Sequence, residues 1–259
     1  MDITVSSPGS PGTSFTSNVK DQIVLLYDEL ASHDDFSSLA DFKTHLEGCG
    51  LNASYTRNIL PFLQYCGIVK YENISPFINE NFFTNIGKTY VDVLKSIQVA
   101  KAEPDGDEKT DILNNLEKIQ EIIYFQCLVI MMKTQECNYS KDFYDVLCFM
   151  KEFESIDSTE YLLIQYEREQ SGNDLLKRLG TYIDQYRDGT ISVNIKTKTK
   201  NADEGKAKSV NSFPYVSGNF LKAGVIYKYK NRFYLNKERI SEIECALREV
   251  DVVCQNSAK

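Results

Sequence analysis

One pattern occurs twice in this chain and constrains its fold more than any other feature. In each copy a helical segment ends at a glycine and continues directly into β-forming residues and a short strand that contains tyrosine, lysine and asparagine. The first copy has the sequence FLQYCGIV at residues 62–69, and the second has FLKAGVI at residues 220–226. Glycine adopts the left-handed backbone conformation that commonly ends a helix. Each copy therefore predicts a helix that turns directly into a β-hairpin.

The residues around the first copy predict a small helical domain. Apolar residues recur at helical spacing over residues 18–33 and 37–47, and a third helix is expected over residues 54–65. β-forming residues follow on both sides of a loop, and Thr84 is placed to cap a further helix that runs to residue 97. The expected order is three helices, a two-stranded hairpin and a closing helix.

This layout resembles the winged-helix family, a variant of the helix-turn-helix. The resemblance covers about 80 residues and rests on Arg57–Leu60 with Phe62 and Leu63, the turn Gly67-Ile68-Val69, and the Thr-x-x-Gly turn within Phe83–Lys88. It is similar to DNA-recognition modules of bacterial restriction enzymes, to replication initiators and to transcription regulators. The resemblance implies binding to double-stranded DNA and leaves the choice among these architectures open.

Composition and periodicity divide the chain into six segments. The fold class expected is mainly α with small β-hairpin wings, as two winged-helix-like units joined by a helical middle. The segments are a Ser-, Gly- and Pro-rich flexible tail (1–17), a winged-helix domain (18–99), a polar linker (100–109), a helical connector (110–156), a second winged-helix-like domain (157–251) and a tail (252–259).

The second unit carries its own local signals. Residues 157–160, Asp-Ser-Thr-Glu, form a capping-box pattern at a helix start. Residues 191–200 alternate as a strand or an extended arm does, and a hairpin is expected around Lys230 and Asn231.

Charge is distributed unevenly and favours the second unit as a nucleic-acid surface. The net charge is −8, but residues 171–259 carry 16 basic and 10 acidic side chains, whereas residues 1–170 carry 13 and 27. Phosphate contacts need accessible cations, and aromatic side chains interleave with the cations here. The basic candidates are Lys196, Lys198, Lys200, Lys206, Lys208, Lys222, Lys228, Lys230 and Arg232, with Tyr215, Tyr227, Tyr229 and Phe233 among or beside them. A solvated lysine-rich loop is the alternative.

The helix expected over residues 54–65 is the second nucleic-acid candidate. Tyr55, Arg57 and Asn58 are expected to face outward, and a helix in the major groove reads bases through such donors. The alternative is an ordinary solvated helix face, which the acidic balance of residues 1–100 favours.

Other chemistry finds little support in the sequence. No catalytic motif occurs, so enzyme activity is the less favoured class, and we expect no cofactor and no metal site. The seven cysteines lack paired spacing, which favours reduced thiols and a cytoplasmic location, and no segment is apolar enough to predict a membrane span. The favoured function is a bacterial or phage DNA-binding protein of a restriction, defence or regulatory system. The alternative is a winged-helix protein-interaction adaptor within a larger assembly, and a protein partner or a homo-oligomer stays open.

Overall fold

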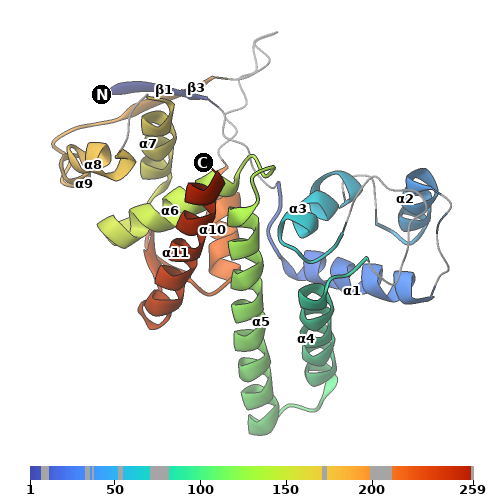
Figure 1. Cartoon of the computed structure of the whole chain (residues 1–259). Coiled ribbons are helices and arrows are strands. Elements are labelled where there is room, and N and C mark those ends of the chain that lie inside the picture. Colours follow the sequence, from blue (N-terminus) through green and yellow to red (C-terminus); the bar gives the residue numbers. More distant parts are fainter. Residues whose placement is uncertain are drawn as a thin grey trace. The chain divides into compact units, whose positions relative to one another are not determined.

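The computed structural model is mainly helical and describes most of the chain (Figure 1). The described residues are 1–6, 12–32, 36, 38–51, 55–70, 82–170, 174–198 and 212–257. They form two compact units. The helical-hairpin unit comprises residues 11–137 and 222–224, and the sheet unit comprises residues 1–10, 138–221 and 225–259. The expected class, mainly α with a small β component, is confirmed.

Side-chain caps begin two helices of the helical-hairpin unit, and the cap at Thr84 confirms the prediction from the sequence. Ser38 Oγ accepts a hydrogen bond from Asp41 N (3.1 Å), and Thr84 Oγ1 accepts one from Gly87 N (3.1 Å). Both bonds satisfy backbone N–H groups that lack partners in a first helical turn. The elements are α1 (Ser17–Ser32), α2 (Leu39–Gly48), a π-helical turn (Tyr55–Ile59), α3 (Leu60–Tyr65), α4 (Asn85–Ala102) and α5 (Asp107–Lys133).

The glycine turn after α3 packs against the start of α4. Gly67 has a φ of 69°, and Ile68 N donates to Leu63 O (2.9 Å), as expected for a left-handed helix end. Thr84 Oγ1 donates to the Gly67 carbonyl (2.5 Å). Of the predicted hairpin, the structure describes the bridge between Val69 and Phe83, and residues 71–81 lie outside the described residues.

A buried aromatic cluster forms part of this unit's core. Phe15 stacks on Tyr124 with 4.1 Å between ring centroids, and it also contacts Phe62 and Tyr90. The prediction of a flexible tail over residues 1–17 is therefore wrong at Phe15, whose ring is fully buried. The chain start is also ordered in the sheet unit, because Asp2–Ser6 forms a strand.

The sheet unit consists of short helices around two small sheets. Its strands are β1 (Asp2–Ser6), β2 (Ser155–Ile156), β3 (Asn194–Lys198), β4 (Ile226–Tyr229) and β5 (Arg232–Leu235). Its helices are α6 (Ser140–Phe153), α7 (Ser158–Glu169), α8 (Leu175–Gly180), α9 (Ile183–Arg187), α10 (Phe213–Lys222), a 3-10 turn (Lys237–Arg239) and α11 (Ile240–Ser257).

Two of the three strand pairings join residues far apart in the sequence, and the third is the β4–β5 hairpin. β1 pairs in parallel with β3, and its Ile3 and Val5 are buried. The second sheet is antiparallel in the order β2-β5-β4, with Ile156 opposite Phe233 and Tyr227 opposite Tyr234. The predicted strand within 191–200 and the predicted β4–β5 hairpin are both confirmed.

Two further expectations concern the capping box at residues 157–160 and the linker at residues 100–109. The predicted capping box is confirmed: Glu160 N donates to Asp157 Oδ1, and Asp157 N donates to Glu160 Oε2, both at 2.9 Å. The linker expected over 100–109 is mostly helical, since α4 ends at Ala102 and α5 starts at Asp107. Residues 175–187 form two short helices, α8 and α9, separated at Thr181 and Tyr182. Among the described residues, no helix is both long and apolar enough to cross a membrane.

Candidate nucleic-acid interface

The β4–β5 hairpin, residues 226–235, follows α10 and presents its tip to solvent. Its strands are joined by the two residues Lys230 and Asn231, and Lys230 has a φ of 54°. A positive φ at the first turn residue matches the twist of a tight hairpin, although a residue other than glycine pays a steric cost there. The hairpin therefore places a lysine at its outermost point.

One face of the hairpin is made of tyrosines. Tyr227 and Tyr234 are opposite each other and stack with 5.6 Å between ring centroids and 22° between ring planes. Tyr229 lies on the same face, with its ring centroid 6.4 Å from that of Tyr234. Tyr227 is 48% exposed and Tyr229 is 58% exposed. Exposed aromatic rings of this kind can stack on bases.

The hairpin lysines are exposed and not used in ion pairs with described residues. Lys228 Nζ lies 5.7 Å from the Phe233 ring centroid, and Lys230 Nζ lies 5.4 Å from that of Tyr229. Neither ammonium group is within ion-pair distance of a carboxylate in the described part of the chain. Both cations are thus held beside aromatic rings and remain accessible to a phosphate.

Arg232 has a different role from the one expected. Its guanidinium donates to Ser155 Oγ (3.1 Å), Asp157 Oδ2 (2.9 Å) and Glu160 Oε2 (2.5 Å). The Glu160 carboxylate is fully buried and also accepts from Arg187 Nε (2.7 Å). A buried carboxylate needs such partners, because an unpaired charge inside a protein is costly. Arg232 therefore holds the hairpin to the start of α7, and its role as a phosphate contact stays a prediction.

The remaining basic candidates are only partly described. Lys196 is exposed on β3, and Lys222 is exposed in the last turn of α10. Lys198 is the last residue of β3, and the structure does not describe its side chain. Lys200, Lys206 and Lys208 lie outside the described residues. Of the basic candidates on residues 191–208, the structure therefore places only the Lys196 side chain.

In the helical-hairpin unit, the helix predicted over residues 54–65 exposes fewer hydrogen-bond donors to solvent than expected. Tyr55 is only 1% exposed, so its prediction as an outward-facing contact is wrong. Arg57 is exposed and Asn58 is partly exposed. The physical reason is that residues 55–59 form a π-helical turn ahead of Leu60, which changes the faces assigned from a regular 3.6-residue repeat.

Tyr234 is the member of the tyrosine face that sequence reasoning missed. Its pairing with Tyr227 requires the register of the two strands, which the turn at Lys230 and Asn231 sets. Counting outward from that turn would have found it.

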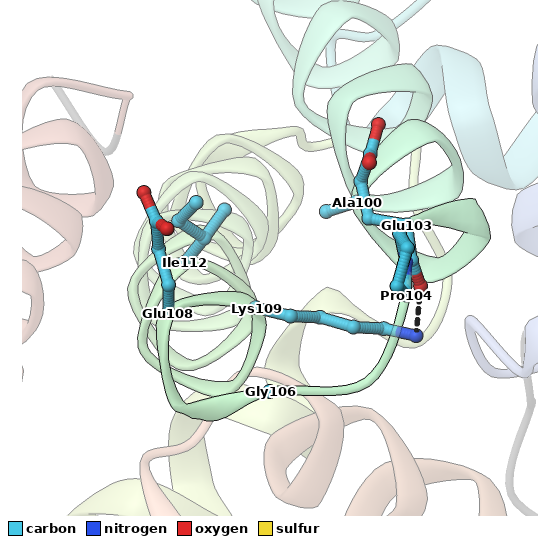
Figure 2. Close-up of a pocket in the computed structure, with 7 residues that line it drawn as sticks. All are labelled: Ala100, Glu103, Pro104, Gly106, Glu108, Lys109 and Ile112. Carbon is cyan, nitrogen blue, oxygen red and sulfur yellow. Dashed lines mark hydrogen bonds between the residues drawn. The ribbon is translucent and has the colours of Figure 1, made fainter.

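A pocket of about 470 Å³ lies in the turn between α4 and α5 (Figure 2). Figure 2 shows the Lys109 side chain crossing this turn, where Nζ donates to the Glu103 carbonyl (2.7 Å). Lys109 also pairs with Asp105 Oδ1 (2.9 Å). The polar groups of this pocket hold the turn together, and we assign it no catalytic role. Its lining residues are Ala100, Glu103, Pro104, Gly106, Glu108, Lys109 and Ile112.

Comparisons with known proteins add no family to these observations. The chain matches no protein-family model, no curated protein and no solved structure.

Proposed function

We propose that this chain binds double-stranded DNA, with the β4–β5 hairpin as its main contact. The observation that carries the proposal is the combination of two exposed tyrosines with two lysines that make no ion pair to described residues, on one projecting hairpin. Lysines on a hairpin contact phosphates without reading sequence. The tyrosines add contact area to sugars or bases.

The order of elements supports assigning this hairpin as the wing of a winged-helix unit. In the sheet unit, α10, the β4–β5 hairpin and α11 follow each other directly, and β2 completes the sheet. In the helical-hairpin unit, α3, the bridge from Val69 to Phe83 and α4 follow in the same order. On this proposal, the sheet unit holds the DNA backbone, and Arg57 and Asn58 of the other unit contribute contacts of their own. A cytoplasmic location is part of the same proposal.

The test is a salt titration of binding to a random duplex, measured by fluorescence anisotropy. Each lysine that contacts a phosphate contributes about 0.9 to the slope of log K against log salt concentration. The double variant Lys228→Gln/Lys230→Gln should therefore lower the magnitude of the slope by about 1.8. The matched control is Lys101→Gln/Lys118→Gln, which removes the same charge from exposed positions on α4 and α5.

The control should leave the slope unchanged, because Lys101 on α4 and Lys118 on α5 lie outside both the β4–β5 hairpin and the turn that carries Arg57 and Asn58. Absence of binding at low salt would refute the proposal. Equal slopes for the two double variants would also refute it, because general charge and not the hairpin would then explain binding.

A protein-interaction adaptor is the second candidate, and one observation favours it. Ile112, Ile119 and Ile122 are large, exposed apolar side chains on α5. Residues 112 and 119 are seven apart and 119 and 122 are three apart, so all three lie along one side of the helix. Such a stripe suits a partner helix. A triple Ile→Lys variant that binds DNA normally but loses a pulled-down partner would assign this stripe to a protein partner.

A further inference from the structure

Three side chains with metal-binding atoms converge between α1 and α2. Glu29 lies in the last turn of α1, His45 lies near the end of α2, and Cys49 follows α2 as its C-cap. Their donor atoms all lie within 4.8 Å of one another. His45 Nε2 is 3.3 Å from Glu29 Oε2 and 3.5 Å from Cys49 Sγ. A single imidazole nitrogen thus faces both a carboxylate oxygen and a thiol.

The spacing of two of these residues explains why they meet. His45 and Cys49 are four residues apart, so the end of α2 carries both donors on one face, one turn apart. Glu29 reaches the same place from a different helix, so the cluster depends on the packing of α1 against α2. Each residue is partly shielded, with the side chain of His45 22% exposed and that of Glu29 27% exposed.

The measured separations agree with those around a tetrahedral zinc ion. With zinc–ligand bonds of about 2.0–2.3 Å and tetrahedral angles, a nitrogen and an oxygen ligand lie about 3.4 Å apart, and a nitrogen and a sulfur ligand about 3.6 Å apart. The two separations from His45 Nε2 in this chain are 3.3 Å and 3.5 Å. The Glu29 carboxylate oxygen and Cys49 Sγ lie within 4.8 Å of each other, so side-chain adjustment can bring all three atoms to one zinc ion.

The charges of the cluster also favour a divalent cation. A bound dication stabilises a carboxylate and a thiolate together. A carboxylate, a thiolate and a neutral imidazole around one dication leave the site close to neutral.

We propose that Glu29, His45 and Cys49 bind a zinc ion, which connects the end of α1 to the end of α2. This inference is independent of the proposed DNA binding. Three protein ligands leave the fourth tetrahedral position to water, and the partial exposure of the cluster gives solvent access to that position. An ion held in this way exchanges more readily than one in a closed four-ligand structural site.

Cobalt substitution tests the site directly, because Co²⁺ adopts the same tetrahedral geometry and absorbs light. The full chain, reduced and free of metal, is titrated with Co²⁺, and the expected result is one equivalent bound with tetrahedral ligand-field bands and a thiolate-to-cobalt charge-transfer band. Zinc should displace the cobalt. Because the ligands lose protons on binding, the affinity should rise with pH over the neutral range.

Variants identify the ligands. Cys49→Ser should remove the charge-transfer band, and His45→Gln and Glu29→Gln should each weaken cobalt binding at least tenfold. The matched control is Cys245→Ser, which removes an exposed cysteine of α11 and should retain the full band. Circular dichroism establishes that each variant is folded, and Glu29→Gln, which keeps size and exposure similar, serves if His45→Gln fails to fold. A band that survives Cys49→Ser, or the absence of any thiolate band in the wild type, would overturn the proposal.

Discussion

A methyl group at Gly87 would collide with the turn that follows α3. A Cβ atom built on Gly87 lies 2.1 Å from the Ile68 carbonyl oxygen and 2.9 Å from the Ile68 carbonyl carbon. Ordinary carbon–oxygen contacts begin at about 3.3 Å, so the turn or the start of α4 would have to move by about 1.2 Å in Gly87→Ala. Both neighbours are backbone, which has little freedom to give way.

The expected loss of stability follows from the bonds at this contact. The Ile68 carbonyl accepts from Thr84 N (3.1 Å), and Thr84 Oγ1 also bonds the Gly67 carbonyl and Gly87 N. Overpacking costs about 2 kcal/mol, and disturbing two hydrogen bonds costs about 1 kcal/mol each. Alanine regains about 1 kcal/mol of helix propensity. The net destabilisation expected for Gly87→Ala is about 3 kcal/mol.

Urea unfolding followed by circular dichroism measures this loss, and hydrogen exchange of the first turns of α4 locates it. Gly48→Ala is the matched control, because outside its own helix backbone and chain neighbours no atom of the described residues lies within 4 Å of a Cβ at this position in α2. The control should be as stable as the wild type or slightly more stable. A loss below about 1 kcal/mol for Gly87→Ala would refute the rigid contact.

Two further predictions concern buried charge and thiol reactivity. Glu160→Gln leaves two arginine side chains facing a neutral amide, so the free energy of unfolding in urea should fall by about 3 kcal/mol. Glu152→Gln, at an exposed position, is the control and should change the free energy of unfolding little. Equal effects of the two variants would contradict a buried ion network. Burial and Glu29 raise the pKa of the Cys49 thiol, so iodoacetamide at pH 8 without metal should modify Cys49 more slowly than exposed Cys245. Glu29→Gln should lower that pKa and therefore accelerate the modification of Cys49. Peptide mass spectrometry measures both rates. An unchanged rate at Cys49 in Glu29→Gln would show that the carboxylate has no influence on the thiol.

Local signals predicted the features whose partners are close in sequence. Thr84 caps α4 by accepting a hydrogen bond from the N–H three residues later, and Asp157 and Glu160 hydrogen-bond each other within one helical turn. The tight turn at Lys230 sets the register of β4 and β5. Each is decided by hydrogen bonds within a few residues, so the pattern of residue types is sufficient.

The features that sequence reasoning missed depend on residues distant in the sequence or on a local departure from a regular helix. Strand β1 forms because residues 194–198 pair with it, and Arg232 is drawn to carboxylates that lie more than 70 residues earlier. Tyr55 is buried because a π-helical turn changes its direction. The distant partners depend on which elements pack together, and the π-helical turn departs from the regular 3.6-residue repeat, so periodicity identifies neither.

Some features of this protein follow from the sequence alone, and others only from its tertiary structure. The sequence determined that one helix ends just before Gly67 and another just before Gly224, because both glycines adopt the left-handed conformation there. It also determined the mainly helical class and the position of the β4–β5 hairpin. Only the tertiary structure decided which cations remain available and that Glu29 meets His45 and Cys49, because charge pairing and donor convergence depend on distances between separate elements.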